Sequence, residues 1–203
     1  MLSKTFTLAF TLVLFLSNSV SAKIWRVNNT PCVATDFTTF DACIANASVL
    51  NGDTVYLEGS PTAYGNSSNI NKRLVFIGTG YFLSGSGANT GLQANTETAF
   101  FNSALRFDSL ASGSRFLGID MRGDLWLDPR ADNIRFERCR FSSISWNTTA
   151  ASTSNRAQNI VFNKCYFNGA STPVQFYYDN LEITNCIITS TLTFNPSNIA
   201  SAL

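Results

Sequence analysis

Four side chains at equivalent positions of a repeated sequence pattern could together bind a ligand. They are Tyr81, Asp120, Arg140 and Tyr166. Tyrosine rings beside charged hydrogen-bonding groups on a flat sheet can dock sugar rings, so these residues are the candidate binding site for a polysaccharide or cell-surface glycan. An alternative stays open, because isolated exposed tyrosines are common on sheets. Asp120 and Arg140 would then form an exposed ion pair worth at most ~1 kcal/mol.

The composition argues against catalysis by this chain. It contains no histidine, which excludes Ser-His and Cys-His pairs, an imidazole base and histidine-ligated metals. Paired carboxylates for glycoside cleavage must lie on one face, about 5–10 Å apart. Only Glu137 and Glu182 suggest such a face, and they fall in different columns two repeats apart. We therefore predict no catalytic residues.

A cluster of acids is the only candidate for holding a metal. It comprises Asp120, Asp124, Asp128 and Asp132, with Arg122 and Arg130 among them. Calcium needs several oxygen ligands that converge on one point. The predicted repeat places these aspartates on different sides of a coil, so no metal site is predicted, and Ca²⁺ stays only as an alternative.

The five cysteines divide into two groups. Cys32 and Cys43 lie in a short N-terminal segment, and a disulfide between them is predicted if the chain is exported. Cys139, Cys165 and Cys186 recur with the repeat and are predicted to pack in the core as free thiols. A disulfide within that column stays open, although parallel in-register side chains aim poorly at one another.

The first 22 residues predict a secretory signal peptide. Lys4 supplies the positive charge, residues 6–16 are apolar, and small residues precede a cleavage site after Ala22. The apolar run is shorter than the ~20 residues that a membrane span requires, so no transmembrane segment is predicted. We expect a secreted or cell-surface protein. The 14 basic and 13 acidic residues form no basic stripe, so nucleic acid is not an expected partner.

A repeat along the chain supplies the elements that would position these side chains. Five segments align, at residues 74–82, 113–121, 133–141, 159–167 and 180–188. Their four inward columns read Val75, Ser114, Ile134, Ile160, Leu181; Ile77, Phe116, Phe136, Phe162, Ile183; Gly80, Ile119, Cys139, Cys165, Cys186; and Phe82, Met121, Phe141, Phe167, Ile188. Polar residues alternate with these columns, which indicates strands, and one three-residue step per segment indicates a corner.

A second set of apolar pairs predicts a third strand in each coil: Val55/Leu57, Leu105/Phe107, Leu125/Leu127, Ile144/Trp146, Val174/Phe176 and Leu192/Phe194. The insertions at residues 84–103 and 147–158 are predicted to be loops. Stacked strands with this order predict an all-β fold, a single-stranded parallel β-helix of about five coils over residues 54–203.

Residues 23–53 are predicted to cap the N-terminal end of this stack. A helix is expected over residues 35–47, with Thr35 or Asp36 as its N-cap, because an exposed stack end leaves apolar side chains and strand edges uncovered. No equivalent cap follows the last predicted strand. We therefore expect either a partner or a C-terminal continuation of a longer chain at that end.

The residues 37–47, the following Asn-Gly-Asp-Thr-Val-Tyr-Leu of residues 51–57, and the recurring Asn-Ile-x-Phe-x-x-Cys-x-Phe of residues 133–141 and 159–167 resemble the pectate-lyase-like β-helix superfamily. The resemblance covers roughly residues 35–195 and implies a right-handed coil. It also implies candidate activities, since lyases of this superfamily hold calcium with clustered aspartates and use an arginine or lysine as base, and its pectin hydrolases use aspartates with a histidine.

Three functions follow from these observations. The first is a non-catalytic structural or binding module outside the cell, which the missing histidine and scattered acids favour. The second is a carbohydrate-binding solenoid that uses the face of Tyr81 and Tyr166. The third is part of a polysaccharide lyase or hydrolase whose catalytic coils lie beyond residue 203.

Overall fold

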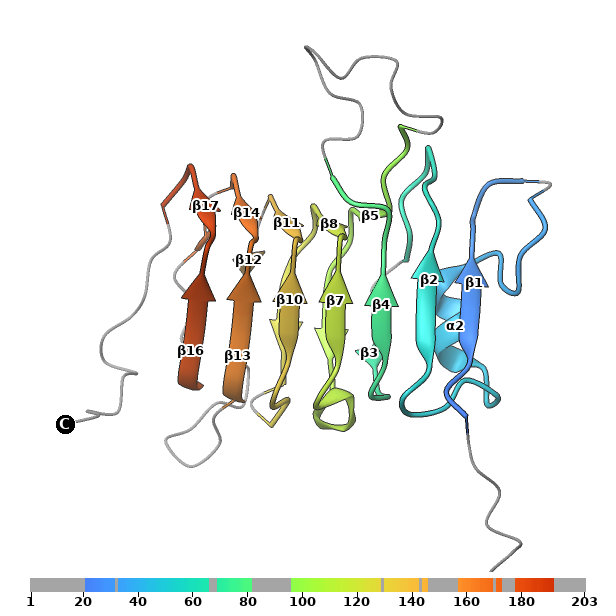
Figure 1. Ribbon diagram of the computed structural model, residues 1–203, viewed down its shortest axis with the longest axis horizontal. Helices are drawn as coiled ribbons and strands as arrows, with labels where there is room; N and C mark the ends of the chain where they lie inside the picture. Colours follow the sequence, from blue (N-terminus) through green and yellow to red (C-terminus); the bar gives the residue numbers. More distant parts are fainter. Residues whose placement is uncertain are drawn as a thin grey trace, which may run out of the picture.

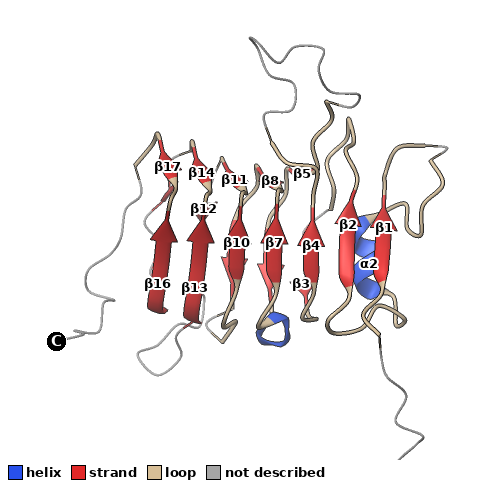
Figure 2. Ribbon diagram, viewed as in Figure 1, coloured by secondary structure: helices blue, strands red, loops and turns tan. Residues whose placement is uncertain are grey.

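The computed structural model describes residues 21–31, 33–65, 69–81, 96–128, 130–142, 144–145, 157–169, 171–172 and 178–191. Strands are the main regular secondary structure of these residues, and every strand pair among them is parallel. They form four sheets of seven, five, three and two strands (Figures 1 and 2). No helix among the described residues has the length and apolar character needed to cross a membrane.

The seven-stranded sheet lies along the longest axis of the molecule (Figure 1). Its strands in spatial order are β1 (Ile24–Val27), β2 (Thr54–Leu57), β4 (Val75–Ile77), β7 (Arg115–Leu117), β10 (Arg135–Glu137), β13 (Ala157–Asn163) and β16 (Tyr178–Thr184). Spatial order follows chain order, so each pass of the chain adds one strand beside the previous one.

The other strands form smaller sheets in the same order. The five-stranded sheet contains β5 (Phe100–Phe101), β8 (Asp120–Met121), β11 (Arg140–Phe141), β14 (Tyr166–Phe167) and β17 (Ile187–Ile188). The three-stranded sheet contains β3 (Asn69–Ile70), β6 (Leu105–Phe107) and β9 (Leu125–Leu127), and the two-stranded sheet contains β12 (Ile144–Ser145) and β15 (Ser171–Thr172). We call a strand of the seven-stranded sheet, together with the strands that follow it in the chain before the next strand of that sheet, a row.

Phenylalanine rings stack through the middle of the molecule. Phe76, Phe116, Phe136 and Phe162 are register partners in adjacent strands of the seven-stranded sheet and are buried. Successive ring centroids lie 4.5, 5.1 and 5.0 Å apart. Each such side chain contributes about 1.5–3 kcal/mol through burial, and its stacked neighbours add to that.

The predicted inward columns are confirmed for the three central repeats. The buried residues there are Ser114, Ile134, Ile160, Phe116, Phe136, Phe162, Ile119, Cys139, Cys165, Met121, Phe141 and Phe167. In the last repeat, Leu181, Ile183 and Cys186 are half-buried and pack against the same core. Ile188 continues the inward column as the register partner of the buried Phe167, and in this last strand it is 46% exposed.

The predicted register is wrong by one residue in the first repeat. Phe76, not Val75 or Ile77, pairs with Phe116, and Leu74 and Phe76 are fully buried. Because side chains alternate along a strand, a shift of one residue exchanges the inward and outward sets. The apolar run Leu-Val-Phe-Ile offers both choices, and only the neighbouring strand decides between them.

The second half of this repeat is also placed differently. Phe101 of β5 pairs with Met121, and Ala99 accepts the backbone hydrogen bond from Asp120 in the row that follows. The columns predicted for Gly80 and Phe82 therefore continue through Ala99 and Phe101. Phe82 lies outside the described residues. The insertion therefore lies within the corner, between β4 and β5, and does not follow the second of these strands.

Two predictions for the third face are corrected. Val55 and Leu57 belong to β2 in the seven-stranded sheet, and Ile70 of β3 is the partner of Phe107. The strands at 105–107 and 125–127 are confirmed, and Ile144 pairs with Ser171. Residues 146, 174, 176, 192 and 194, predicted to complete this face, lie outside the described residues.

The N-terminal end carries one strand that the sequence reading missed. β1 pairs with β2 from Ile24 to Val27, so residues 23–53 contribute a strand as well as a helix. Asp53 anchors this end, because its buried carboxylate accepts hydrogen bonds from the backbone amides of Lys23 and Leu50 and from the Trp25 indole. Such charge-assisted bonds are about twice as strong as neutral ones.

The helix is shorter than predicted. It is α2 (Phe40–Ala45), and its N-cap is Thr39, whose hydroxyl accepts from the Ala42 amide at 3.1 Å. Thr35 and Asp36 bond to the Arg26 backbone instead, so neither is the N-cap. Phe40, Cys43 and Ile44 of α2 pack into the core of the stacked rows.

Candidate functional site

The outward face of the five-stranded sheet holds most of the predicted binding residues. Asp120, Arg140, Tyr166 and Ile187 are register partners in successive strands, which confirms that part of the predicted column. Phe100 occupies the position predicted for Tyr81. The corner insertion causes this difference, because it moves Tyr81 out of the strand ladder.

Tyr81 nevertheless reaches the same face. Its ring stacks on that of Tyr166, with centroids 6.3 Å apart and planes inclined by 17°. Burial raises the pKa of the Tyr81 hydroxyl, so the ring remains a neutral phenol at physiological pH. The structure therefore brings the two predicted tyrosines together. They meet by stacking across the corner, whereas the sequence predicted them in one column of strands.

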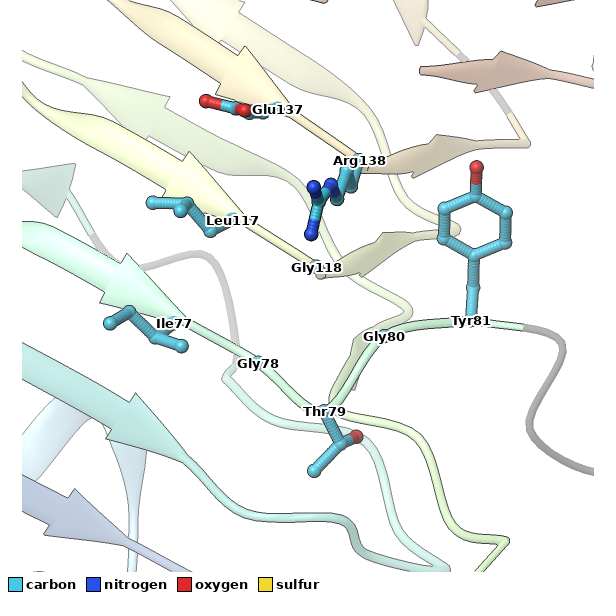
Figure 3. A pocket seen from close by; sticks show the side chains of 9 residues that line it. All are labelled: Ile77, Gly78, Thr79, Gly80, Tyr81, Leu117, Gly118, Glu137 and Arg138. Atoms are coloured by element: carbon cyan, nitrogen blue, oxygen red, sulfur yellow. The ribbon is translucent and has the colours of Figure 1, made fainter. Parts of the chain in front are cut away.

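A hollow of about 540 Å³ lies at the corner beside Tyr81, and we call it the corner hollow. In Figure 3 the backbones of Gly78, Gly80 and Gly118 form its floor, Arg138 extends over Gly118, and Tyr81 stands at the opposite side. A Cβ atom on Gly78 would lie 2.5 Å from the Gly118 carbonyl oxygen, so the close approach of these two rows requires glycine.

Charged groups surround Glu137 at the edge of the corner hollow. The same Glu137 oxygen, Oε2, lies 3.8 Å from Nη2 of Arg115 and 3.7 Å from Nε of Arg135. Arg115 and Arg135 are register partners in β7 and β10, so two like charges face each other across adjacent strands. Glu137 offsets a repulsion that would otherwise destabilise the pair.

A second hollow of about 270 Å³ lies over the start of the five-stranded sheet, and we call it the Asp120 hollow. Asp120 is fully buried there, with Oδ2 2.9 Å from Nε of Arg122 and Oδ1 3.4 Å from Nε of Arg140. The expectation of an exposed Asp120–Arg140 pair is therefore wrong. Arg122, which also covers the Phe100 ring at 4.0 Å, makes the pair a partly buried cluster of three charges.

The rim of the Asp120 hollow is polar. Thr98 Oγ1 lies 3.5 Å from Nη2 of Arg122, and Glu97 is an exposed acid at the edge. The two guanidinium groups in this hollow are thus balanced by two carboxylates, Asp120 and Glu97. The hollow offers many hydrogen-bonding groups without a net charge.

The remaining predicted acids do not converge with Asp120. Asp128 bonds to Arg130, and although burial acts to raise its pKa, those bonds hold the pKa below the usual value. Asp132 accepts from the Gln158 backbone amide. Within the described part of the chain, no three Asp, Glu, Cys or His side chains form a group that could hold a metal ion. Ca²⁺ stays an untested alternative.

The cysteine column is a column of thiols. Cys139 and Cys165 are buried, Cys186 is half-buried, and each Sγ donates to a backbone carbonyl of the preceding row. Burial raises the pKa of Cys186, and the Cys139 thiol together with burial raises that of Cys165, so both remain protonated. Protonated thiols are poor nucleophiles and poor metal ligands.

The predicted disulfide at the N-terminus stays a prediction. Cys43 is a buried free thiol in the structure, and burial raises its pKa to about 12. Cys32 lies outside the described residues.

Four arginines were not predicted as binding residues: Arg122 and Arg138, which line the two hollows, and Arg115 and Arg135, which lie against Glu137. Arg115 and Arg135 occupy the same position of consecutive repeats, and that repetition of charge was a usable signal. Arg122 and Arg138 lie just outside a strand, where the repeat alone does not reveal direction. Comparison of the chain with protein-family models, curated proteins and solved structures finds no match.

Proposed function

We propose that the protein is a secreted or cell-surface right-handed parallel β-helix that binds carbohydrate without transforming it. Consistently parallel, in-register pairing and the stacked Phe column support the β-helix architecture. The repeat's resemblance to the pectate-lyase-like superfamily supports its handedness, together with the general preference for right-handed parallel connections. The N-terminal signal sequence supports export.

The stacked pair of Tyr81 and Tyr166 beside the corner hollow is the observation that carries carbohydrate binding. Aromatic faces pack on the apolar faces of sugar rings, and hydrogen-bonding groups around them fix the orientation of the sugar hydroxyls. Glu137 and Arg138 supply such groups at the same hollow. A volume of about 540 Å³ suits one or two sugar rings.

The chemistry of the acids supports binding in preference to catalysis. Asp120 and Glu137, one acid from each hollow, both lie against pairs of arginines. Glu137 also lies in register with Thr184 through Asn163, and not with Glu182, so these two glutamates share no column. They lie on one face but are offset by two strands and two residues, roughly 12 Å between Cα atoms, which exceeds the about 5–10 Å that a general acid and a nucleophile require.

A glycan array probed with the secreted chain tests the proposal. We expect binding to at least one glycan, and loss of most of that binding in Tyr166→Ala, because the stacked platform disappears. Trp126→Ala is the matched control, since Trp126 is an outward, half-buried aromatic on the three-stranded sheet, away from both hollows. Silence of the array, or equal losses in the two variants, contradicts the proposal. Release of reducing or unsaturated sugars from a bound glycan contradicts its non-catalytic part.

A further inference from the structure

Positive charge is concentrated at the corner hollow. The whole chain is nearly balanced, with 14 basic and 13 acidic residues. At this corner, however, Arg138 and Glu137 line the hollow, and Arg115 and Arg135 lie 3.8 and 3.7 Å from the Glu137 carboxylate, so three guanidinium groups accompany one carboxylate. The Asp120 hollow has no such excess. The corner is thus the part of the ligand-sized surface that attracts an anion.

We infer that the corner hollow binds a tetrahedral oxyanion, a sulfate or phosphate ester carried by the glycan, through Arg138 with Arg115 and Arg135 behind it. The inference rests on the proposed carbohydrate function, and it names the chemical class of the ligand.

Glu137 leaves the donors of its two neighbours only partly satisfied. Its distances to Arg115 and Arg135, 3.8 and 3.7 Å, exceed the ~2.7–2.9 Å of a charge-assisted hydrogen bond. The two arginine side chains are 52% and 39% exposed, so they can turn toward a ligand. An anion bound at this edge would reduce the repulsion between the facing guanidinium groups.

The backbone conformation at Arg138 also supports an anion site. Its φ is 52°, in the left-handed region that residues other than Gly, Asn and Asp rarely adopt. The preceding row has Gly118 at this position and the last has Asn185, both of which adopt it easily. A strained residue at a hollow is a common feature of functional sites. In Figure 3 the Arg138 side chain extends across the floor toward Gly118, where a ligand would rest.

The arrangement of the donors favours an ester over a carboxylate. Arg115 and Arg135 belong to the neighbouring strands β7 and β10, and Arg138 directly follows β10 at the corner. A sulfate or phosphate group offers three acceptor oxygens in different directions, whereas a carboxylate offers two in one plane. Tyr81, on the other side of the hollow, is placed to hold the sugar ring that carries the group.

Isothermal titration of the secreted chain with four sugars tests the inference: glucose 6-sulfate, glucose 6-phosphate, glucuronate and glucose. We expect the two esters to bind at least about tenfold more tightly than glucuronate or glucose, and to lose affinity as salt rises. Dextran sulfate and dextran provide the same comparison for a polymer.

Two variants of the corner column form a matched pair. Arg138→Asn removes the guanidinium and keeps a residue that accepts the left-handed backbone, and Lys164→Asn makes the same kind of change one row away, where φ is 56°. We expect about a tenfold loss of ester binding in the first and none in the second. Glu137→Gln should tighten ester binding, because the competing carboxylate is gone, and a purely structural role for Glu137 would not produce that gain.

The outcomes separate this inference from the proposed function. Equal binding of glucose, glucuronate and the esters, unaffected by Arg138→Asn, overturns the inference and leaves carbohydrate binding standing. Absence of all sugar binding, with inorganic sulfate still bound through Arg138, supports the anion site and overturns the carbohydrate function. Single-stranded DNA bound through Arg138 as tightly as dextran sulfate overturns the assignment to a glycan ester.

Discussion

Three strands of the seven-stranded sheet, β10, β13 and β16, have a left-handed residue near the start and another just after the end, and the two positions differ in side chains although they share a backbone conformation. Near the start lie Asn133, which precedes β10, and Asn159 and Asn180, which lie within β13 and β16, with φ between 56° and 59°. Just after the end lie Arg138, Lys164 and Asn185, with φ between 52° and 56°. We call these the asparagine column and the basic column.

The asparagine column compensates its backbone locally. The side-chain amide of Asn159 donates to Asn133 at 3.0 Å, and that of Asn180 donates to Asn159 at 3.1 Å. Asparagine also tolerates φ above zero better than most residues. The basic column has Arg138 and Lys164 at a similar backbone angle, which arginine and lysine tolerate less well than asparagine does. Local hydrogen bonds explain the first column, whereas ligand binding is our explanation for Arg138 in the second.

The largest effect is expected for Phe136, in the strand that connects the asparagine column to the basic column. Phe136 lies in β10 between Asn133 and Arg138, and it stacks between Phe116 and Phe162. Phe136→Ala should lower the free energy of unfolding by about 3–5 kcal/mol, because it leaves a cavity in the core. Urea denaturation measures this loss. The milder Phe136→Leu should cost less, and equal stability of the wild type and the Ala variant would contradict the inward assignment.

Acid sensitivity should come from outside both columns, since neither contains a carboxylate. Burial acts to raise the pKa of Asp53, but the hydrogen bonds from Leu50, Lys23 and Trp25 outweigh it and lower the pKa in the folded protein. The stabilisation is therefore complete above the unfolded pKa of about 3.9 and is lost as pH falls through the lower folded value.

Asp53→Asn should cost about 2 kcal/mol at neutral pH, because hydrogen bonds to a charged acceptor become neutral ones. It should also flatten the fall in stability below about pH 4. Urea midpoints measured across the acid range for both proteins test this. The same acid dependence in the variant would show that other carboxylates carry the effect.

A smaller loss is expected from the asparagine column itself. Asn159→Ala should cost about 1–2 kcal/mol, because it removes two exposed hydrogen bonds and places a Cβ-bearing residue without a polar side chain at φ 56°. Asn159→Gly keeps the backbone conformation and should cost less in the same denaturation experiment. If Gly and Ala cost the same, the backbone angle is not what the column compensates.

The smallest effect should have the opposite sign. Arg138→Asn and Lys164→Asn should each stabilise the protein by up to about 1 kcal/mol, because asparagine relieves the left-handed backbone. Thermal unfolding of the two variants checks this against the wild type. A stability loss in either would mean that the basic side chain stabilises the fold, and would weaken the contrast between the columns.

The inward face of the central repeats was predictable because the residue pattern allows only one face to be buried. Phe136 lies between Arg135 and Glu137, so only one face of its strand can be buried. The first repeat failed because Leu74, Val75, Phe76 and Ile77 are all apolar, and alternation gives no direction there. The prediction of the site was incomplete for a related reason. The corner geometry sets the direction of side chains just outside the strands, such as Arg122 and Arg138.

The sequence alone determined the parallel repeat, the inward Phe and Cys columns and the absence of histidine chemistry, because each depends on residue type and spacing within one segment. Tertiary structure decided which residues share a hollow. The stacking of Tyr81 on Tyr166, the ion pair of Asp120 with Arg140 and the approach of Arg115 to Glu137 all join separate rows. Contacts of this kind depend on the register and on the insertion at the corner, and neither is encoded in a single repeat.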